Sequence, residues 1–189
     1  MLIFQAVVYE QEPSRCIQPD EALFARIAAG EKSAFCTLYE QCSASVYAFA
    51  LSILRNREDA EDAMQETFLK IRGAAHLYEA QGKPMAWIMT ITRNICLMAC
   101  RRRSHFADCP ETDIPDLGLE QISDADDRLV LEKALKMLPE DVCRIIMLHA
   151  VSGMKHREIA AVMQMPLSTV LSKYNRGIRT LRRELEEKS

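Results

Sequence analysis

Residues 155–177 hold the feature that most constrains how this chain can fold. Two short segments with apolar side chains at helical spacing flank a break at residues 164–166. We expect helices at about 155–163 and 167–185, which together form a helix-turn-helix. The second helix of such a motif can enter the major groove of DNA. The apolar residues of the two segments are Ile159, Ala160, Met163, Val170, Tyr174 and Ile178.

The second of these helices carries hydroxyl groups and positive charges opposite its apolar stripe. Such groups are suited to contact phosphates and base edges, whereas the apolar side belongs in a protein core. The candidate DNA contacts of this helix are Thr169, Ser172, Lys173 and Arg176.

The formal net charge of −3 hides two basic blocks. Residues 83–105 contain five basic and no acidic side chains, and residues 155–183 contain seven basic and one acidic. Residues 106–154, which lie between them, contain four basic and eleven acidic side chains. Two separated basic blocks predict two separate nucleic-acid contacts, not one continuous basic surface.

The remainder of the chain shows helical periodicity, scarce glycine and no strand pattern. Residues 105–124 break the periodicity and are rich in acidic residues and proline, which predicts a linker. We therefore expect an all-α protein with two small helical domains joined by an acidic flexible linker. The expected parts are a tail at 1–19, a domain at 20–104, the linker at 105–124 and a second domain at 125–189. Further helices are expected near 21–29, 33–54, 58–72, 84–103, 125–137 and 139–150.

The expected helix at 58–72 has two different sides. Its apolar stripe consists of Ala60, Met64, Phe68 and Ile71, and a second side consists of Asp62, Gln65, Glu66 and Leu69. Acidic residues near a helix N-terminus are favourable whether or not they bind anything. Charge alone therefore favours a solvated surface over a binding surface.

The expected helix at 84–103 combines an apolar stripe with a basic end. Three arginines in the last turn are stabilised by the helix dipole even without a partner. Lys83, Arg93 and the absence of acidic residues nevertheless favour phosphate contact. Trp87 lies beside the stripe and is expected in the core. The stripe is predicted to consist of Met85, Ile88, Ile91, Ile95 and Met98.

The sequence gives little support for a metal site, an enzyme active site, export or membrane insertion. Cys96 and Cys100 are four residues apart, but no further ligands follow at the spacing of a zinc site, so we expect no metal and no cofactor. No Gly-rich phosphate loop and no catalytic motif is present, so we expect no enzyme. No export signal and no apolar stretch long enough for membrane insertion is found, which predicts a cytoplasmic protein with reduced cysteines.

With these residues established, the chain resembles the extracytoplasmic-function (ECF) group of sigma-70 factors of bacterial RNA polymerase. Residues 59–71 are similar to the family's polymerase-binding helix, and residues 84–94 with 101–103 to its minus-10 reading helix. Residues 138–144 resemble the start of the fourth region, and residues 158–176 match its helix-turn-helix. The four matches occur in the family's order and span nearly the whole chain.

The resemblance implies a sigma factor that confers promoter specificity on core polymerase and assists transcription initiation. It implies that the first domain binds the clamp helices of the largest subunit through Asp62, Gln65 and Glu66, and that the second binds the flap. The basic helix would take the minus-10 strand, and the helix-turn-helix would read the minus-35 element of promoter DNA. An anti-sigma factor is a common partner. The implied minus-10 contacts are Arg93, Asn94, Arg101 and Arg102, with His76, Tyr78 and Gln81 as candidates for holding a flipped base.

Five positions depart from the family pattern. Met98 stands where an acid is usual, Leu171 where a basic residue is frequent, and Gly177 where Ala is usual. Lys155 replaces a typical serine N-cap, which costs about 1 kcal/mol. Gln164 replaces a turn glycine, which implies either a left-handed residue or a different turn.

Two alternative functions remain open from the sequence. A stand-alone helix-turn-helix repressor or activator would bind a palindrome without polymerase. A thiol- or metal-switched regulator would use Cys96 and Cys100.

Overall fold

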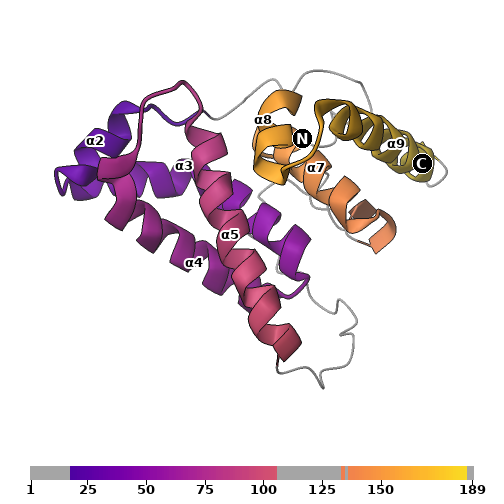
Figure 1. Ribbon diagram of the computed structural model, residues 1–189, viewed down its shortest axis with the longest axis horizontal. Coiled ribbons are helices and arrows are strands. Elements are labelled where there is room, and N and C mark those ends of the chain that lie inside the picture. The colour runs from indigo at the N-terminus through magenta and orange to yellow at the C-terminus, as the bar shows by residue number, and fades with distance from the viewer. Residues whose placement is uncertain (1–17, 106–132, 135, 187–189) are drawn as a thin grey trace. The chain divides into compact units, whose positions relative to one another are not determined.

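The structure is a computed structural model that describes residues 18–105, 133–134 and 136–186 (Figure 1). Every regular element in these residues is a helix, which confirms the all-α prediction. The chain divides into two compact units, one of residues 17–118 and one that contains residues 119–189. The helix expected at 125–137 lies mostly outside the described residues, although residues 133, 134, 136 and 137 are helical.

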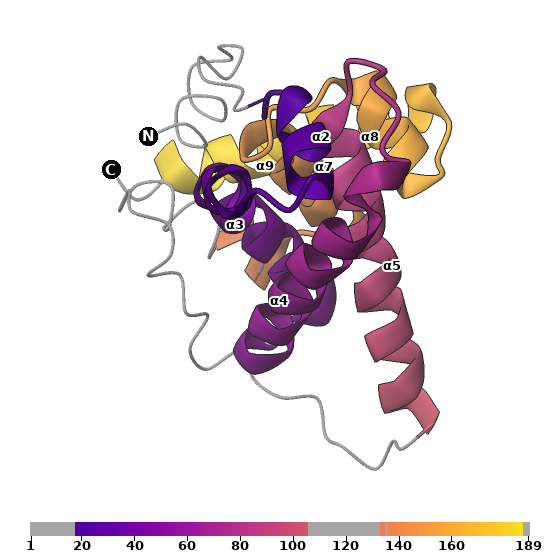
Figure 2. The same cartoon turned by 90° about the vertical axis from the view of Figure 1, so that its left-hand side faces the viewer.

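The first unit is built around one central helix, α3, which contacts α2, α4 and α5. Every side chain from Ser45 to Leu54 is buried, so the second half of α3 is covered on all sides. The helices α4 and α5 pack against α3 and against each other (Figure 2). The elements are α2 (Ala22–Ala28), α3 (Lys32–Leu54), α4 (Arg57–Ala74), the 3-10 helix η1 (Ala75–Leu77) and α5 (Pro84–His105).

Local signals set the ends of two of these helices. Gly30 has a φ of +86°, and its N–H donates to the Ile27 carbonyl at 2.9 Å. The next N–H, that of Glu31, donates to the Arg26 carbonyl at 3.0 Å, which completes a Schellman motif at the end of α2. At the start of α4, the Asn56 side chain accepts a bond of 3.0 Å from the Asp59 N–H.

The second unit contains three described helices around a core that includes Ile145, Ile146, Val170 and Leu181. Gly177 lies where α9 crosses α7. A Cβ at this position would clash with Val142 Cγ1 and lie 2.7 Å from Ile146 Cδ1. The glycine therefore allows the two helices to approach closely, which explains why alanine is absent here. The helices are α7 (Glu140–Ala150), α8 (His156–Met163) and α9 (Leu167–Glu186).

The turn between α8 and α9 contains a left-handed residue that is not glycine. Gln164 has φ +56° and ψ +43°. Its N–H donates to the Ala161 carbonyl at 3.2 Å, and the Met165 N–H donates to the Ala160 carbonyl at 3.0 Å. These bonds form a Schellman motif, so the first of the two predicted alternatives is correct.

Three aromatic rings connect the helices of this unit. His149 of α7 and His156 of α8 stack with centroids 4.5 Å apart. Tyr174 of α9 meets them edge-on, with centroids at 4.9 and 4.7 Å respectively. His149 Nδ1 also lies 2.8 Å from the Met154 carbonyl oxygen. This cluster fixes α9 against the first helix of the helix-turn-helix.

Candidate functional site

The second side of α4 is an exposed polar surface with an apolar residue in it. Asp62, Gln65 and Glu66 are all exposed, and Leu69 is 66% exposed one turn further along. Glu66 pairs with Lys70 at 3.3 Å across the helix surface. An exposed leucine among carboxylates is better suited to a protein partner than to DNA. The opposite stripe of Ala60, Met64, Phe68 and Ile71 is buried, as predicted.

The exposed side of α5 differs from the predicted pattern at one position. Met98 is 43% exposed, so its assignment to the inner stripe was wrong. It lies between Asn94 and Arg101 on the same side of the helix, because the three residues are four and three positions apart. Arg102 is also exposed, whereas Arg93 is half-buried and points to another side. The candidate contacts on α5 therefore surround an apolar methionine.

The last arginine of the basic run has a partner within the unit. The Arg103 guanidinium forms an ion pair with Asp59 in the first turn of α4. Arg103 therefore connects the end of α5 to the start of α4. The two preceding arginines, which are the predicted DNA contacts, are exposed.

An aromatic cluster supports the loop before α5. Tyr78 stacks on Phe24 with centroids 4.1 Å apart, and Trp87 meets both rings at 5.3 Å. The Tyr78 hydroxyl donates to Glu21, whose Oε1 also accepts from the Gly82 N–H at 2.8 Å. The hydrogen bond from Tyr78 lowers the pKa of Glu21. Burial, followed by the bond to Glu21, raises the pKa of Tyr78.

The three candidates for holding a flipped base differ in their exposure and in whether they belong to this cluster. Tyr78 is half-buried and engaged in the cluster, whereas His76 and Gln81 are exposed. Gln81 donates to the Glu79 carboxylate at 3.2 Å. Trp87 packs against two rings, as a core residue would, but it is only half-buried.

The polar side of α9 brings together the four residues predicted from the sequence. Ser172 and Arg176 are exposed, and Thr169 is half-buried. Lys173 is 30% exposed and forms an ion pair with Asp141 of α7. Burial raises the pKa of Asp141, but the hydrogen bond and charge of Lys173 outweigh it, and the net pKa is lowered. Lys173 therefore already has a partner within its own domain.

Two further arginines extend this side of α9, and the sequence reading did not single them out. Arg179 and Arg183 are exposed and follow Arg176 by three and seven positions, so the three share one side. The same helical spacing that identified Arg176 could have identified them. Leu171 is 40% exposed on a different side of the helix.

The start of α8 has half of a capping box. The Lys155 N–H donates to Glu158 Oε2 at 3.0 Å. A lysine side chain has no acceptor, so it cannot return a bond to the backbone of the first turn as serine would. The expected loss relative to a serine N-cap therefore has a structural cause.

Cys96 and Cys100 do not form a common exposed pair on α5. Cys96 is fully buried, and Cys100 is exposed. Within the part of the chain that the structure describes, no three His, Cys, Asp or Glu residues are placed to hold a metal ion. Among the same residues, no helix combines the length and the apolar character needed to cross a membrane.

Two family models match the chain, one in each unit. The model of Sigma-70 region 2 matches residues 38–106, and that of Sigma-70, region 4 matches residues 128–181. The first match covers most of α3, with α4 and α5. The second covers α7, α8 and most of α9.

Two relatives agree with these matches. The ECF RNA polymerase sigma factor SigK of Mycobacterium tuberculosis (strain ATCC 25618 / H37Rv) is 26% identical over 186 residues, covering 92% of this chain and 97% of the relative. The ECF RNA polymerase sigma factor SigE of Mycolicibacterium smegmatis is 32% identical over 160 residues, covering 80% and 62%. The structure of CnrH in complex with the cytosolic domain of CnrY has a TM-score of 0.62 at 22% identity, covering 91% of this chain and all of that one, and shares the fold.

Proposed function

This chain belongs to the ECF group of the sigma-70 family and is a non-catalytic specificity subunit of RNA polymerase, and we propose how it divides that work between its two units. The first unit binds core polymerase and the minus-10 element. The second binds the polymerase flap and the minus-35 element. The observation that carries this division is that each unit matches one sigma-70 region and has its own exposed cationic helix.

The polar side of α4 is the proposed docking surface for the clamp helices of the largest polymerase subunit. Asp62, Gln65 and Glu66 supply its polar contacts, and Leu69 supplies an apolar contact that the sequence reading placed on this side. Truncating one interface side chain typically costs about 1–2 kcal/mol when it lies near the centre of the interface. The exposed Glu66–Lys70 pair contributes only about 0.3–0.5 kcal/mol to folding.

Glu66→Ala should therefore weaken binding to core polymerase about tenfold and leave thermal unfolding almost unchanged. Glu40→Ala on α3, which also removes an exposed carboxylate, is the matched control and should bind normally. Both are measured by titrating labelled chain with core enzyme. Equal affinity of Glu66→Ala and the unmodified chain would show that the docking surface is misassigned.

The exposed side of α5 is the proposed contact with the minus-10 strand. Asn94, Arg101 and Arg102 contact the strand directly, and Arg93 supports it from the adjoining side. Met98, which lies between Asn94 and Arg101, offers an apolar surface to an unstacked base in place of the usual acid. A flipped base costs a few kcal/mol of unstacking, which contacts of this kind must offset.

The polar side of α9 is the proposed reading surface for the minus-35 element. Thr169, Ser172 and Arg176 are positioned toward base edges and phosphates, and Arg179 and Arg183 extend the cationic row along the helix. Lys173 also contributes a positive charge to this surface, but that charge is partly neutralised by its ion pair with Asp141. The reading surface therefore depends on the packing of α9 against α7.

Regulation and location follow from the partners. CnrH, which shares this fold, is described in complex with the cytosolic domain of CnrY. By analogy, an anti-sigma factor holds this chain inactive until it is released. The site of action is the cytoplasm, where polymerase and promoter DNA are found.

The test compares DNA binding with and without core polymerase. A sigma factor should retain a promoter duplex only when core enzyme is present. The alternative, a stand-alone helix-turn-helix regulator, should bind its palindrome equally well alone. Specific binding by the free chain that core polymerase does not improve would overturn the proposal.

A further inference from the structure

A single carboxylate joins the start of α2 to the loop before α5. Glu21, the N-cap residue of α2, lies 57 positions from Tyr78 and 61 from Gly82 along the chain. Its Oε1 accepts a hydrogen bond from the Tyr78 hydroxyl and another, of 2.8 Å, from the Gly82 N–H. Both ends of the segment 78–82 are therefore held at one oxygen atom. We call the residues between these two ends, 79–81, the arch.

The backbone at the end of the arch is shaped to receive a carboxylate. Gly82 has a φ of +68°, the left-handed conformation that glycine adopts without strain. The pKa of Glu21 is lowered first by the bond from Tyr78 and, against the opposing effect of burial, also by the N–H groups of Gly82, Gln81 and Lys83. Successive N–H groups in a turn form a concave site for an anion. Here the anion is the side chain of Glu21, so the shape of the loop depends on that residue.

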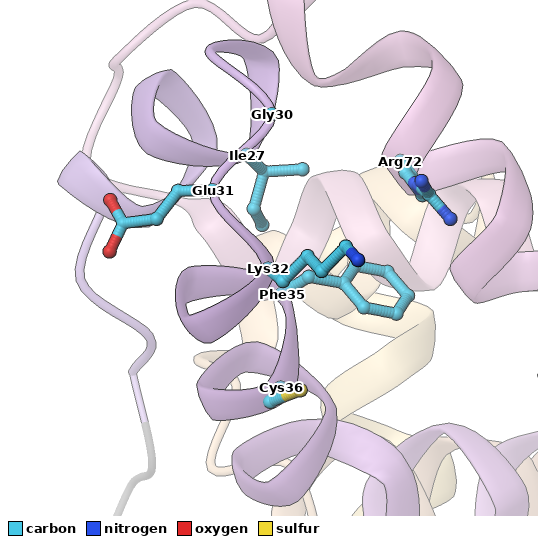
Figure 3. A pocket seen from close by; sticks show the side chains of 7 residues that line it. All are labelled: Ile27, Gly30, Glu31, Lys32, Phe35, Cys36 and Arg72. Carbon is cyan, nitrogen blue, oxygen red and sulfur yellow. The ribbon is translucent and has the colours of Figure 1, made fainter.

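The other end of α2 is fixed although its packing is incomplete. A cavity of about 220 Å³ opens where α2 turns into α3, and Ile27, Lys32 and Arg72 are among the residues that line it (Figure 3). Figure 3 shows the Glu31 carboxylate directed away from Lys32 and Arg72. Arg26 Nε donates to Glu31 Oε2 at 2.7 Å, which adds to the Schellman motif at this end of α2. The helix is therefore a fixed base from which Glu21 holds the loop.

The arch presents its side chains to solvent. Glu79, Ala80 and Gln81 are all exposed. Gln81 Nε2 donates to the Glu79 carboxylate at 3.2 Å, a surface contact that another hydrogen-bond partner can replace. A glutamine amide carries both donors and an acceptor, so Gln81 can bond to the edge of an unstacked base.

Tyr78 supports the arch and is not part of its exposed surface. Its ring stacks on Phe24 with centroids 4.1 Å apart, and its hydroxyl is engaged by Glu21. His76 lies in η1, outside the arch. Of the three candidates for holding a flipped base, Gln81 is therefore the one that the arch presents.

We propose that Glu21 is a positioning residue for minus-10 recognition, because it holds the arch in the conformation in which Gln81 meets the edge of the flipped base. This rests on the proposed function, in which the first unit takes the minus-10 strand. Without the carboxylate, the segment loses its anchor at Gly82 and must be ordered when the strand binds. That cost falls on the contact made by Gln81, so the chain discriminates less between bases at one position.

The experiment transcribes a pool of templates randomised at the minus-10 element, with core polymerase and the full chain, each template carrying a transcribed barcode. The readout is the preference at each position, which is the ratio of the favoured base to the next. Glu21→Ala should lower this ratio at least about fivefold at one position and leave the other positions unchanged. A merely structural role would weaken all positions alike. Equal loss at every position, or no loss at any, would overturn the positioning role.

Two further variants test whether Glu21 acts through Gln81. Gln81→Ala should lose the preference at the same position, and adding Glu21→Ala to it should cause no further loss. Loss at a different position, or additive loss, would contradict the arch as the connection. Glu21→Gln keeps an acceptor oxygen and should retain the preference within about twofold. A loss as large as that of Glu21→Ala would contradict the hydrogen-bond anchor.

Tyr78→Phe keeps the proposal testable if Glu21→Ala fails to fold, because it preserves the stacked ring and removes one donor. It should lower the same preference about twofold, and an unchanged preference would count against the anchor. Asp20→Asn is the matched control, since this exposed carboxylate bonds to the Ala22 N–H at 2.9 Å and not to the loop. It should keep every preference, and position-specific loss in Asp20→Asn would show that Glu21 has no special role.

The unmodified chain separates this inference from the proposed function. No preference at any minus-10 position in the unmodified chain would overturn the proposed function, and the role of Glu21 with it. Normal preferences in the unmodified chain that Glu21→Ala leaves intact would overturn the role of Glu21 alone.

Discussion

Gln164 shows how one residue sets the geometry of the DNA-reading motif. It adopts a left-handed conformation, in which a side chain with a Cβ is disfavoured by about 1–2 kcal/mol. The Schellman bonds to Ala160 and Ala161 fix this conformation. The turn between α8 and α9 is therefore retained at a cost in stability.

Gln164→Gly should raise the unfolding free energy by about 0.5–1 kcal/mol, because glycine adopts this conformation without strain. Gln164→Ala keeps the Cβ and should gain nothing, which makes it the control. Chemical unfolding of the full chain, followed by circular dichroism, gives both values. A stabilising alanine variant would show that the side chain beyond Cβ, and not the backbone, is the source of strain.

Asp141 connects protonation to the position of Lys173. The lowered pKa means that folding favours the ionised carboxylate, so its contribution to stability is present above its usual pKa of 3.8. This contribution is lost as the pH falls through the lowered folded-state value. The carboxylate and Lys173 are both partly exposed, which limits the contribution to about 1 kcal/mol.

Asp141→Asn should therefore be less stable than the unmodified chain at pH 7, by up to about 1 kcal/mol. The difference should shrink as the pH falls from about 4 through the lowered folded-state pKa, where the aspartate of the folded chain itself becomes neutral. Paired unfolding measurements at a series of pH values check this, since the other carboxylates cancel between the two proteins. A difference that stays constant down to pH 2 would argue against the ion pair.

Residue-level prediction from the sequence succeeded where spacing within one helix decides the outcome. The polar side of α9 was visible in this way, whereas the departure at Gln164 was visible from the turn glycine that is usual in the family. The pair of Asp141 and Lys173 was not, because 32 positions separate the partners and only the packing of α7 on α9 brings them together. The same applies to Arg103 and Asp59, which join two helices.

At the scale of elements, the contact between α7 and α9 depends on a glycine inside a helix. Glycine costs a helix about 1 kcal/mol relative to alanine, yet at Gly177 a Cβ would collide with Val142 and Ile146. Overpacking of this kind typically costs about 1–3 kcal/mol. The close approach of the helices therefore outweighs the helix propensity.

Gly177→Ala should destabilise the chain by about 1–2 kcal/mol, since the collision exceeds the gain in propensity. Gly73→Ala provides the opposite case, because a Cβ there would meet nothing within 4 Å. That variant should stabilise α4 by about 0.5–1 kcal/mol. Thermal unfolding of both variants tests the account, and a stabilising Gly177→Ala would contradict it.

The helices themselves were largely predictable, but their environment was not. Periodicity located α3 correctly, yet it could not show that residues 45–54 are buried on every side. Burial on every side depends on packing between elements, and α3 contacts α2, α4 and α5. Met98 illustrates the reverse error, since it continues the apolar spacing of α5 but lies on the exposed side of the helix, with Asn94 and Arg101.

At the scale of the whole molecule, the separate functions that we propose for the two units explain how a chain with a net negative charge can bind DNA. A net charge of −3 is unfavourable for binding DNA, but each unit presents a cationic helix of its own. In the proposed function, strong promoter binding requires that both surfaces engage at once. In the proposed function, core polymerase meets this condition by positioning both units on one DNA.

The sequence was sufficient to identify the sigma-70 family, because four motifs appear in the family's order along the chain. The sequence could not predict the cavity beside Gly30. It is formed by residues from α2, α3 and α4 that meet only in the folded unit, and its charge depends on the contact of Arg26 with Glu31. Sites of this kind require the structure.

The most direct measurement is transcription by purified core polymerase from templates randomised at the minus-10 and minus-35 positions, with and without this chain. We expect transcripts that depend on the chain and come from templates enriched in two elements at a fixed spacing. No chain-dependent transcript, or enrichment of a single palindromic element, would contradict the two-part promoter contact proposed for the two units.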